Sequence, residues 1–236
     1  MIQSGQLVMQ KFRSDFDIFE KQGTSLVTSV DLENEQFLQK ELLKIVPDAG
    51  FIAEESGNSE KQSDFIWVID PLDGTRNFVK GIPHFCIMVA LMHKNDLIMA
   101  AIYQPTTHEL YYAEKGKGLW LQGKQRIEFL DKNMQIQGAI AVCSDKQLKV
   151  LKLQMYNQGV YIAHRYFGSA GIDAIYVATG SVDFVMFEHV GWWDIAAGLL
   201  IIQEAGGLIC QYTPSTEKPG YGTLKAGNQL FFHKNL

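Results

Sequence analysis

The stretch "WVIDPLDGTRNF", residues 67 to 78, places two aspartates three positions apart, with a proline between them and a glycine and a threonine directly behind. Asp70 stands before Pro71, and because a proline ring disfavours the helical region for its predecessor, Asp70 is predicted to finish an extended strand. Asp73 falls at the N-cap position of the short turn "GTRNF", where its side chain can accept backbone N–H groups. Taken alone, these residues are also compatible with an Asx-type turn, since Asp, Pro and Gly are common turn formers.

Acidic residues elsewhere in the chain favour a metal site over a simple turn. The apolar stretches "GFIAEES" (50 to 56) and "DFIWVIDP" (64 to 71) are predicted strands that both end in carboxylates, and Asp194 opens a predicted helix after two tryptophans. Oxygen ligands without clustered His or Cys are the set that Mg²⁺ and Mn²⁺ prefer. Four converging carboxylates would repel one another strongly without cations, so the pattern predicts metal binding.

The residues behind Asp73 predict a place for phosphate. Gly74 has no side chain and a helical turn begins there, so free N–H groups and the positive end of the helix dipole suit an anion. A metal site beside a phosphate site indicates phosphoryl chemistry.

The rest of the chain predicts a mixture of helices and strands. Extended structure is expected at "SLVTSVD" (25 to 31) and an antiparallel meander over residues 85 to 123. Helices are expected at Leu7 to Lys21, Leu32 to Val46, residues 169 to 179, and about Asp194 to Glu204. This mixture is typical of layered α/β or α+β architecture. No repeat or linker divides the chain, so we expect one domain over residues 1–236, or two intimate lobes.

Composition limits the classes of partner. The 236 residues are 47% hydrophobic, enough for a substantial core, and the net charge of −5 argues against nucleic acid as the primary partner. The cysteines lack metal-ligand spacing and are expected to be reduced core thiols; they are Cys86, Cys143 and Cys210. Neither a signal peptide nor an apolar run of membrane-spanning length is evident, so a cytoplasmic protein without a membrane partner is expected.

Three separated motifs resemble the inositol monophosphatase family of Mg²⁺-dependent, lithium-sensitive phosphatases. They are "AEES" (53 to 56), "DPLDGTRNF" (70 to 78) and "WDIAAGLLIIQEAGG" (193 to 207), in the order and approximate spacing of that family. "SLVTSVD" resembles a further family segment, with Ser25 in place of its first Asp, and "GSAG" (168 to 171) resembles its substrate loop. The resemblance covers nearly the whole chain after about Lys21. It implies an α/β sandwich of alternating helix and sheet layers, often assembled as a homodimer.

The resemblance also implies a role for each matching residue. The implied metal ligands, with Asp70 bridging two ions, are Glu54, Asp70, the backbone carbonyl of Leu72, Asp73 and Asp194. Asp31 and Thr75 match the pair that, with Glu54, orients a metal-bound water for attack on phosphorus, and Gly74 and Thr75 match phosphate contacts. The implied substrate contacts are Asp73, Gly168, Ser169, Ala170, Glu188 and Asp194. Two or three Mg²⁺ ions are implied, with Mn²⁺ as an alternative. Lys21 resembles a lysine near that site, with an exposed helix end as the alternative interpretation.

The resemblance implies a phosphoric monoester hydrolase acting on a small phosphorylated metabolite. An ungapped comparison puts Phe187 where many members have a glutamate that binds substrate hydroxyls, with Glu188 one position later. Either a local shift allows Glu188 to serve, or the pocket is less polar and prefers another monoester. The scarcity of Lys and Arg favours one phosphate group, so an ester like inositol 1-phosphate is preferred over fructose 1,6-bisphosphate or a nucleotide 3'-phosphate.

Two interpretations of other classes stay open. A haloacid-dehalogenase-type phosphatase uses D-x-D-G-T, with its first Asp as nucleophile, but the spacing here is D-x-x-D-G-T. A non-catalytic, metal-dependent binding or regulatory module is the other alternative. The intact set of acidic residues, together with Asp31 and Thr75, favours catalysis.

Overall fold

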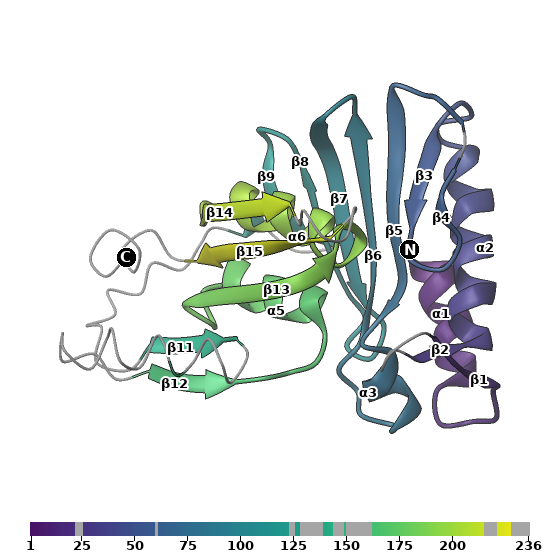
Figure 1. Ribbon diagram of the computed structural model, residues 1–236, viewed down its shortest axis with the longest axis horizontal. Coiled ribbons are helices and arrows are strands. Elements are labelled where there is room, and N and C mark those ends of the chain that lie inside the picture. Colours follow the sequence, from purple (N-terminus) through teal and green to yellow (C-terminus); the bar gives the residue numbers. More distant parts are fainter. Residues whose placement is uncertain are drawn as a thin grey trace.

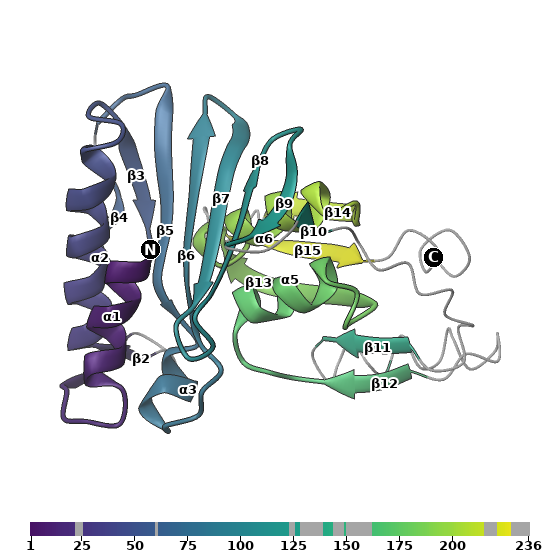
Figure 2. The ribbon, with the colours of Figure 1, turned by 180° about the vertical axis from the view of Figure 1, so that it is seen from behind.

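The computed structural model describes residues 1–21, 26–59, 61–122, 126–127, 139–143, 149, 162–214 and 221–227. Its elements form alternating layers (Figure 1): two helices, an eight-stranded sheet, two more helices and a five-stranded sheet. The view from behind shows the same order reversed (Figure 2), so the second helix pair lies between the two sheets. The predicted layered α/β architecture is confirmed.

The eight-stranded sheet is the central layer. Its strand order is β10-β9-β8-β7-β6-β5-β3-β4, and β3 and β5 are parallel while the other neighbours are antiparallel. The predicted meander corresponds to β6 through β9. The strands are β3 (Gly50–Ala53), β4 (Gly57–Asn58), β5 (Phe65–Asp73), β6 (Cys86–His93), β7 (Asp96–Gln104), β8 (Glu109–Glu114), β9 (Gly118–Leu121) and β10 (Arg126–Ile127).

Helices cover both faces of this sheet. On one face lie α1 (Ile2–Lys11) and α2 (Ser29–Leu43), and on the other lie α5 (Ala170–Ala178) and α6 (Trp192–Glu204). Each interface has its own apolar cluster of buried side chains. Complete burial of a Leu, Ile or Phe side chain contributes about 1.5–3 kcal/mol, so these clusters hold the layers, and the elements that carry the acidic motifs, in place.

The second sheet packs on the far side of α5 and α6. Its order is β12-β11-β13-β15-β14, with parallel pairing of β11 to both β12 and β13. The strands are β11 (Ala139–Val142), β12 (Ile162–Arg165), β13 (Phe184–Gly191), β14 (Leu208–Pro214) and β15 (Tyr221–Gly227). A separate two-stranded ribbon pairs β1 (Ile18–Glu20) with β2 (Leu26–Thr28).

Both predicted bounds of the first helix, Leu7 and Lys21, are wrong. The helix begins at Ile2 and ends at Lys11, and residues Ile18–Glu20 form a strand instead. Arg13 has φ 62°, in the left-handed region, and the Ser14 hydroxyl donates to the carbonyl of Lys11 at 2.8 Å. A side chain that competes for the last helical carbonyls favours a helix end. The residues around Gly23, expected to end that helix, lie outside the described residues.

Two further boundaries differ from the prediction. Helix α2 begins at Ser29 because Thr28 and Asp31 form a capping box, so only part of "SLVTSVD" is extended, and Ser25 lies outside the described residues. Strand β5 continues past Asp70 to Asp73, with a register shift between them where Pro71 lies. The N-cap of α3 (Thr75–Val79) is therefore Gly74, and not Asp73 as expected.

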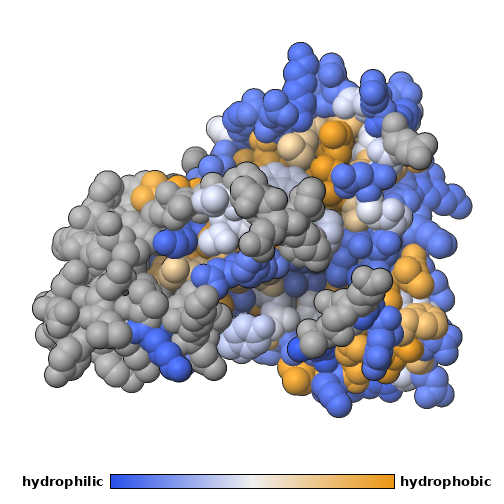
Figure 3. Space-filling model, in the orientation of Figure 1, coloured by the Kyte–Doolittle hydropathy of each residue, from blue (hydrophilic) through white to orange (hydrophobic). Residues whose placement is uncertain are grey.

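The surface is polar where hairpin turns and α2 face solvent, along the upper rim and right-hand margin of Figure 3. Apolar residues gather at the lower right of that view, around α1 and β1, and Ile18 and Phe19 of β1 are exposed. Among the described residues, no helix combines the length and the apolar character needed to cross a bilayer.

Candidate metal centre

Three carboxylates from separate elements converge beside β5. Glu54 follows β3, Asp70 lies in β5 and Asp194 lies in the first turn of α6. One oxygen of each lies within 4.8 Å of the other two. Asp70 is 1% exposed, and the other two residues are half-buried. The cluster therefore offers oxygen atoms alone, without a nitrogen or sulfur ligand.

Parallel pairing places two of these acids side by side. Ala53 of β3 lies opposite Ile69 of β5, and the Glu54 amide donates to the Ile69 carbonyl at 3.2 Å. The residue that follows each member of this pair is an acid, Glu54 or Asp70. Asp194 arrives on α6, which packs against β5, and its Oδ2 accepts the Gly191 amide at 2.6 Å. That bond anchors the carboxylate at the start of its helix.

Burial and mutual repulsion disfavour the charged forms of these acids. Desolvation raises the pKa of Asp70 well above its usual value, and the charges of Glu54, Asp73 and Asp194 raise it further. Desolvation followed by the charge of Glu54 does the same to the pKa of Asp194. A divalent cation would remove this repulsion, because it favours ionised ligands.

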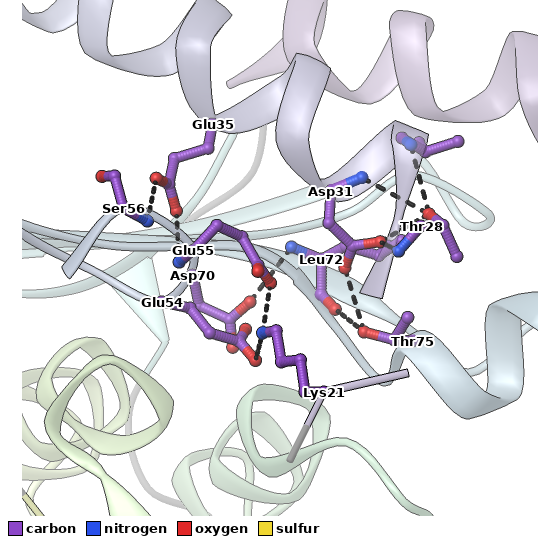
Figure 4. Close-up of polar contacts among 11 residues, drawn as sticks. Lys21, Thr28, Asp31, Glu35, Glu54, Glu55, Ser56, Asp70, Leu72 and Thr75 are labelled. Carbon is purple, nitrogen blue, oxygen red and sulfur yellow. Dashed lines mark hydrogen bonds and ion pairs between the residues drawn. The ribbon is translucent and has the colours of Figure 1, made fainter. Parts of the chain in front are cut away.

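Lys21 brings a positive charge to the cluster (Figure 4). Its Nζ lies 3.2 Å from Glu54 and 2.7 Å from Glu55. Burial alone lowers the pKa of Lys21, but the two carboxylates outweigh that effect and the pKa is raised. Desolvation raises the pKa of Glu55 to about 7 in spite of its bond to Lys21. Glu35 accepts the amides of Glu55 and Ser56 at 2.9 and 2.8 Å, which fixes the turn after β3.

Asp31 and Thr75, the predicted catalytic pair, are hydrogen-bonded to each other. The Thr75 hydroxyl lies 3.0 Å from Asp31 Oδ1 and 3.0 Å from the Leu72 carbonyl, and can donate to either. Asp31 is fully buried, and its Oδ2 accepts the amide of Thr28 at 2.8 Å and the Thr28 hydroxyl. Burial raises the pKa of Asp31 even though these bonds oppose the rise.

Asp73, a predicted metal ligand, binds the start of α5. Its Oδ2 accepts the hydroxyl of Ser169 and the amide of Gly171, both at 2.6 Å, and the Cys86 thiol at 3.4 Å. Its Oδ1 accepts the Ala170 amide at 3.1 Å. The expected local cap of "GTRNF" is therefore wrong, because the carboxylate caps a helix almost a hundred residues away. In the described part of the chain, the three-acid cluster does not include Asp73.

The predicted phosphate and substrate residues meet at the same corner. Gly74 has φ 93°, and a Cβ on it would lie 2.9 Å from the His84 carbonyl and 3.3 Å from the Gly168 carbonyl. Only glycine fits both the left-handed backbone and this close approach. Gly74 therefore lies close to the backbone of Gly168, the residue that begins the loop with Ser169 and Ala170.

A β-bulge in β13 begins at Phe187 and includes Glu188, the two residues considered for the substrate-hydroxyl position. The pairing with β15 shifts between Phe187 and Val190, and His189 between them has φ 56°. Phe187 and Val190 both pack against the apolar core, whereas Glu188 is exposed. Phe187 is thus packed against the core, whereas Glu188 and His189 are both exposed.

The donor set fits a hard divalent cation. Three converging carboxylates are suitable ligands for Mg²⁺ or Mn²⁺, which prefer oxygen. The neighbouring Cys86 is buried, and desolvation followed by the charge of Asp73 raises the pKa of its thiol well above the usual value. A protonated thiol is a poor metal ligand, so sulfur does not change this preference.

Residues 1–235 match the model of the inositol monophosphatase family. The chain belongs to the inositol monophosphatase family. Three relatives show the range of names within it. Nus factor SuhB of Pasteurella multocida is 38% identical over 208 residues, covering 85% of this chain and 77% of that protein. Inositol-1-monophosphatase of Caulobacter vibrioides is 35% identical over 225 residues, covering 92% and 88%. Fructose-1,6-bisphosphatase/inositol-1-monophosphatase of Thermotoga maritima is 35% identical over 213 residues, covering 89% and 80%.

A solved structure of the inositol monophosphatase family has the same fold. The Thermotoga maritima IMPase superposes with a TM-score of 0.83 at 29% identity, covering 99% of this chain and 91% of that chain. The predicted fold class, an α/β sandwich of inositol monophosphatase type, is confirmed. The family is Mg²⁺-dependent, and the cluster of Glu54, Asp70 and Asp194 could bind the metal.

Several residues around this inositol monophosphatase family site were not predicted from the sequence. Cys86 was expected to be an ordinary core thiol, yet it contacts Asp73. Asn77, inside the "DPLDGTRNF" motif, donates to the carbonyl of Phe167, directly before the substrate loop. Glu35 supports the turn that holds Glu54 and Glu55. These residues share no local sequence signal, because their roles depend on partners that lie far away in the sequence or in the backbone.

Proposed function

We propose that the chain is a Mg²⁺-dependent phosphatase that hydrolyses a small phosphate monoester resembling inositol 1-phosphate. The observation that carries the proposal is the position of the Asp31–Thr75 pair next to the oxygen-only cluster, where Thr75 also contacts the carbonyl of Leu72. A proton acceptor beside a cation site is what metal-assisted hydrolysis requires.

The proposed metal ligands are Glu54, Asp70, the Leu72 carbonyl, Asp73 and Asp194, with Asp70 shared between two ions. When held by these residues, Mg²⁺ would lower the pKa of a water molecule and would neutralise charge on the leaving oxygen. Calorimetric titration of Mg²⁺, and of Mn²⁺ as an alternative ion, would give the number of ions.

The protein's own groups handle the proton. When the Thr75 hydroxyl donates to Asp31 Oδ1, a lone pair of its oxygen is free to accept a proton from the attacking water. Asp31 can then take the hydroxyl proton, and because burial raises its pKa, it is a better base than an exposed aspartate. Gly74 and Thr75 are proposed to bind the phosphate, while Gly168, Ser169 and Ala170 line the substrate side.

Phosphate release tests this function directly. Purified protein would be supplied with a panel containing inositol 1-phosphate, fructose 1,6-bisphosphate and a nucleotide 3'-phosphate, while Mg²⁺ is titrated with and without lithium. We expect Mg²⁺-dependent, lithium-inhibited release, fastest with the polyol monophosphate. Preference for the bisphosphate would favour the activity that the Thermotoga maritima relative's name includes. A trapped phospho-aspartate on Asp70 would instead favour the dehalogenase-type mechanism.

Glu188 is expected to select polyol substrates. In Glu188→Gln the amide is a weaker acceptor than a carboxylate for substrate hydroxyls, so kcat/KM for inositol 1-phosphate should fall by about tenfold or more. The value for a phosphate monoester without neighbouring hydroxyls should change little. Equal losses for both substrates would contradict the role, and Glu114→Gln, on the exposed end of β8, is the matched control.

A second candidate is a non-catalytic role. The Pasteurella multocida relative is named a Nus factor, and this chain is 38% identical to it. Protein that binds Mg²⁺ and a phosphate ester but releases no phosphate from the panel would favour such a binding or regulatory module.

Homodimer formation and a cytoplasmic location stay predictions. Light scattering on the purified protein would decide whether it forms a homodimer.

A further inference from the structure

Asn77, in α3, joins three backbone segments through its side-chain amide. Its Nδ2 donates to the carbonyl of His84 at 2.7 Å and to that of Phe167 at 2.8 Å, and it lies 3.4 Å from the Gly168 carbonyl. An amide nitrogen carries two hydrogens, so the two short bonds use both. The side chain therefore ties the segment after α3 to the loop before α5, whose Phe167 lies ninety residues after Asn77.

The backbones around Asn77 approach closely because two glycines allow it. Gly168 has φ 77°, and a Cβ there would lie 3.2 Å from Asn77 Nδ2. A Cβ on Gly74 would likewise lie 2.9 Å from the His84 carbonyl and 3.3 Å from the Gly168 carbonyl. The three segments thus pack together without intervening side chains, and Asn77 supplies the polar link between them.

Asp73, which lies in the same sequence motif as Asn77, binds the C-terminal part of this loop. Asp73 accepts the Ser169 hydroxyl and the amides of Ala170 and Gly171. Asn77 therefore holds Phe167, directly before residues 168–171, and Asp73 holds residues 169–171. Only four positions separate these two side chains in the sequence, so one short segment determines where the loop lies.

We propose that Asn77 is a positioning residue that fixes the 168–171 loop against Gly74, and thereby sets how tightly the site binds a phosphate ester. The consequence for the ester rests on the proposed function. Among the described residues, Asn77 makes no hydrogen bond to Glu54, Asp70 or Asp194, so metal binding by these three acids should not depend on it. An aspartate has the same shape but offers only acceptors, and would face three carbonyl oxygens.

Asn77→Asp should raise KM for the phosphate ester by about tenfold or more, because a displaced loop misplaces the substrate. The turnover number should change much less, and the Mg²⁺ affinity measured by calorimetry should stay unchanged. Asn77→Ala, which removes the bonds without adding repulsion, should have the smaller KM effect. Asn95→Asp, the same change on the exposed turn after β6, is the control and should behave as wild type.

Amide hydrogen exchange tests, independently of activity, whether Asn77 fixes the 168–171 loop. The amides of Ala170 and Gly171 should exchange faster in Asn77→Asp than in wild type or Asn95→Asp. Unchanged exchange rates would overturn the proposal that Asn77 fixes this loop. A lower melting temperature with wild-type KM would show a merely structural role and would also overturn the proposal. If wild-type protein releases no phosphate, the proposed function fails, whereas the exchange rates still decide whether Asn77 fixes the loop.

Discussion

Asp70→Asn is expected to reduce phosphate release by about a thousandfold or more at saturating Mg²⁺, while making the metal-free protein more stable at neutral pH. The loss of activity follows because a neutral amide removes charge where preorganised electrostatics matter most. Asp70 is 1% exposed and belongs to the three-acid cluster. Near-normal turnover in this variant would contradict the bridging role. The matched control is Asp48→Asn, whose side chain is 97% exposed.

The gain in stability follows from the raised pKa values. In the metal-free fold, Asp70 and Asp194 hold protons at a pH where the unfolded chain, with pKa near 3.9 for Asp, has lost them. Their contribution to stability is therefore greatest at low pH and is lost as the pH rises from about 4 through the raised values. Asp70→Asn removes one such charge, so its free energy of unfolding should fall less steeply with pH.

Without Mg²⁺ the Asp70→Asn variant should be the more stable protein, and with saturating Mg²⁺ wild type should be the more stable one. A ligand at a hundred times its Kd stabilises the native state by about 2.7 kcal/mol, which corresponds to roughly 5–11 °C in Tm for a chain of this size. Wild type should gain this shift and Asp70→Asn much less of it. Melting curves with and without Mg²⁺ between pH 5 and pH 8 measure both effects. Equal Mg²⁺ shifts in the two proteins would show that Asp70 is not a ligand.

The motifs around the strand ends predicted the convergence of Glu54, Asp70 and Asp194 because each acid follows a local pattern. An apolar strand or helix start delivers a side chain to a defined edge, and parallel pairing aligns Glu54 with Asp70. The ribbon strand β1 was missed for the opposite reason. Its three residues are exposed and carry no periodic signal, so a neighbouring helical pattern was extended over them.

The hydrogen-bond partners of Asp73 could not be predicted from the residues next to it in the sequence. Its hydrogen bonds connect residues separated by 96 to 98 positions, and the local turn chemistry gave an equally good but different acceptor role. Asn77 is similar, because its partners are backbone carbonyls, which any sequence provides. Long-range polar contacts of this kind depend on how layers pack, whereas local patterns report only which elements form.

Thr75→Val is expected to lower the turnover number by about a hundredfold to a thousandfold while leaving Mg²⁺ binding intact. Valine has the shape of threonine but cannot bond to Asp31 Oδ1 or to the Leu72 carbonyl, both 3.0 Å from the hydroxyl. The proton of the attacking water then has no hydroxyl through which to reach Asp31. Calorimetry of Mg²⁺ separates this effect from lost metal, and Thr107→Val, on the exposed turn after β7, is the control.

Thr75→Ser distinguishes the hydroxyl from the shape of the side chain. Serine keeps the donor and should restore most of the turnover, because the bond to Asp31 needs only the oxygen. Burial raises the pKa of Asp31, so the acidic limb of the pH profile in wild type and Thr75→Ser should lie above the value of an ordinary aspartate. That limb should disappear from the residual activity of Thr75→Val, since Asp31 no longer communicates with the water. If Thr75→Val kept both the turnover number and this limb, the attacking water would lose its proton by a route that does not involve the Asp31–Thr75 pair.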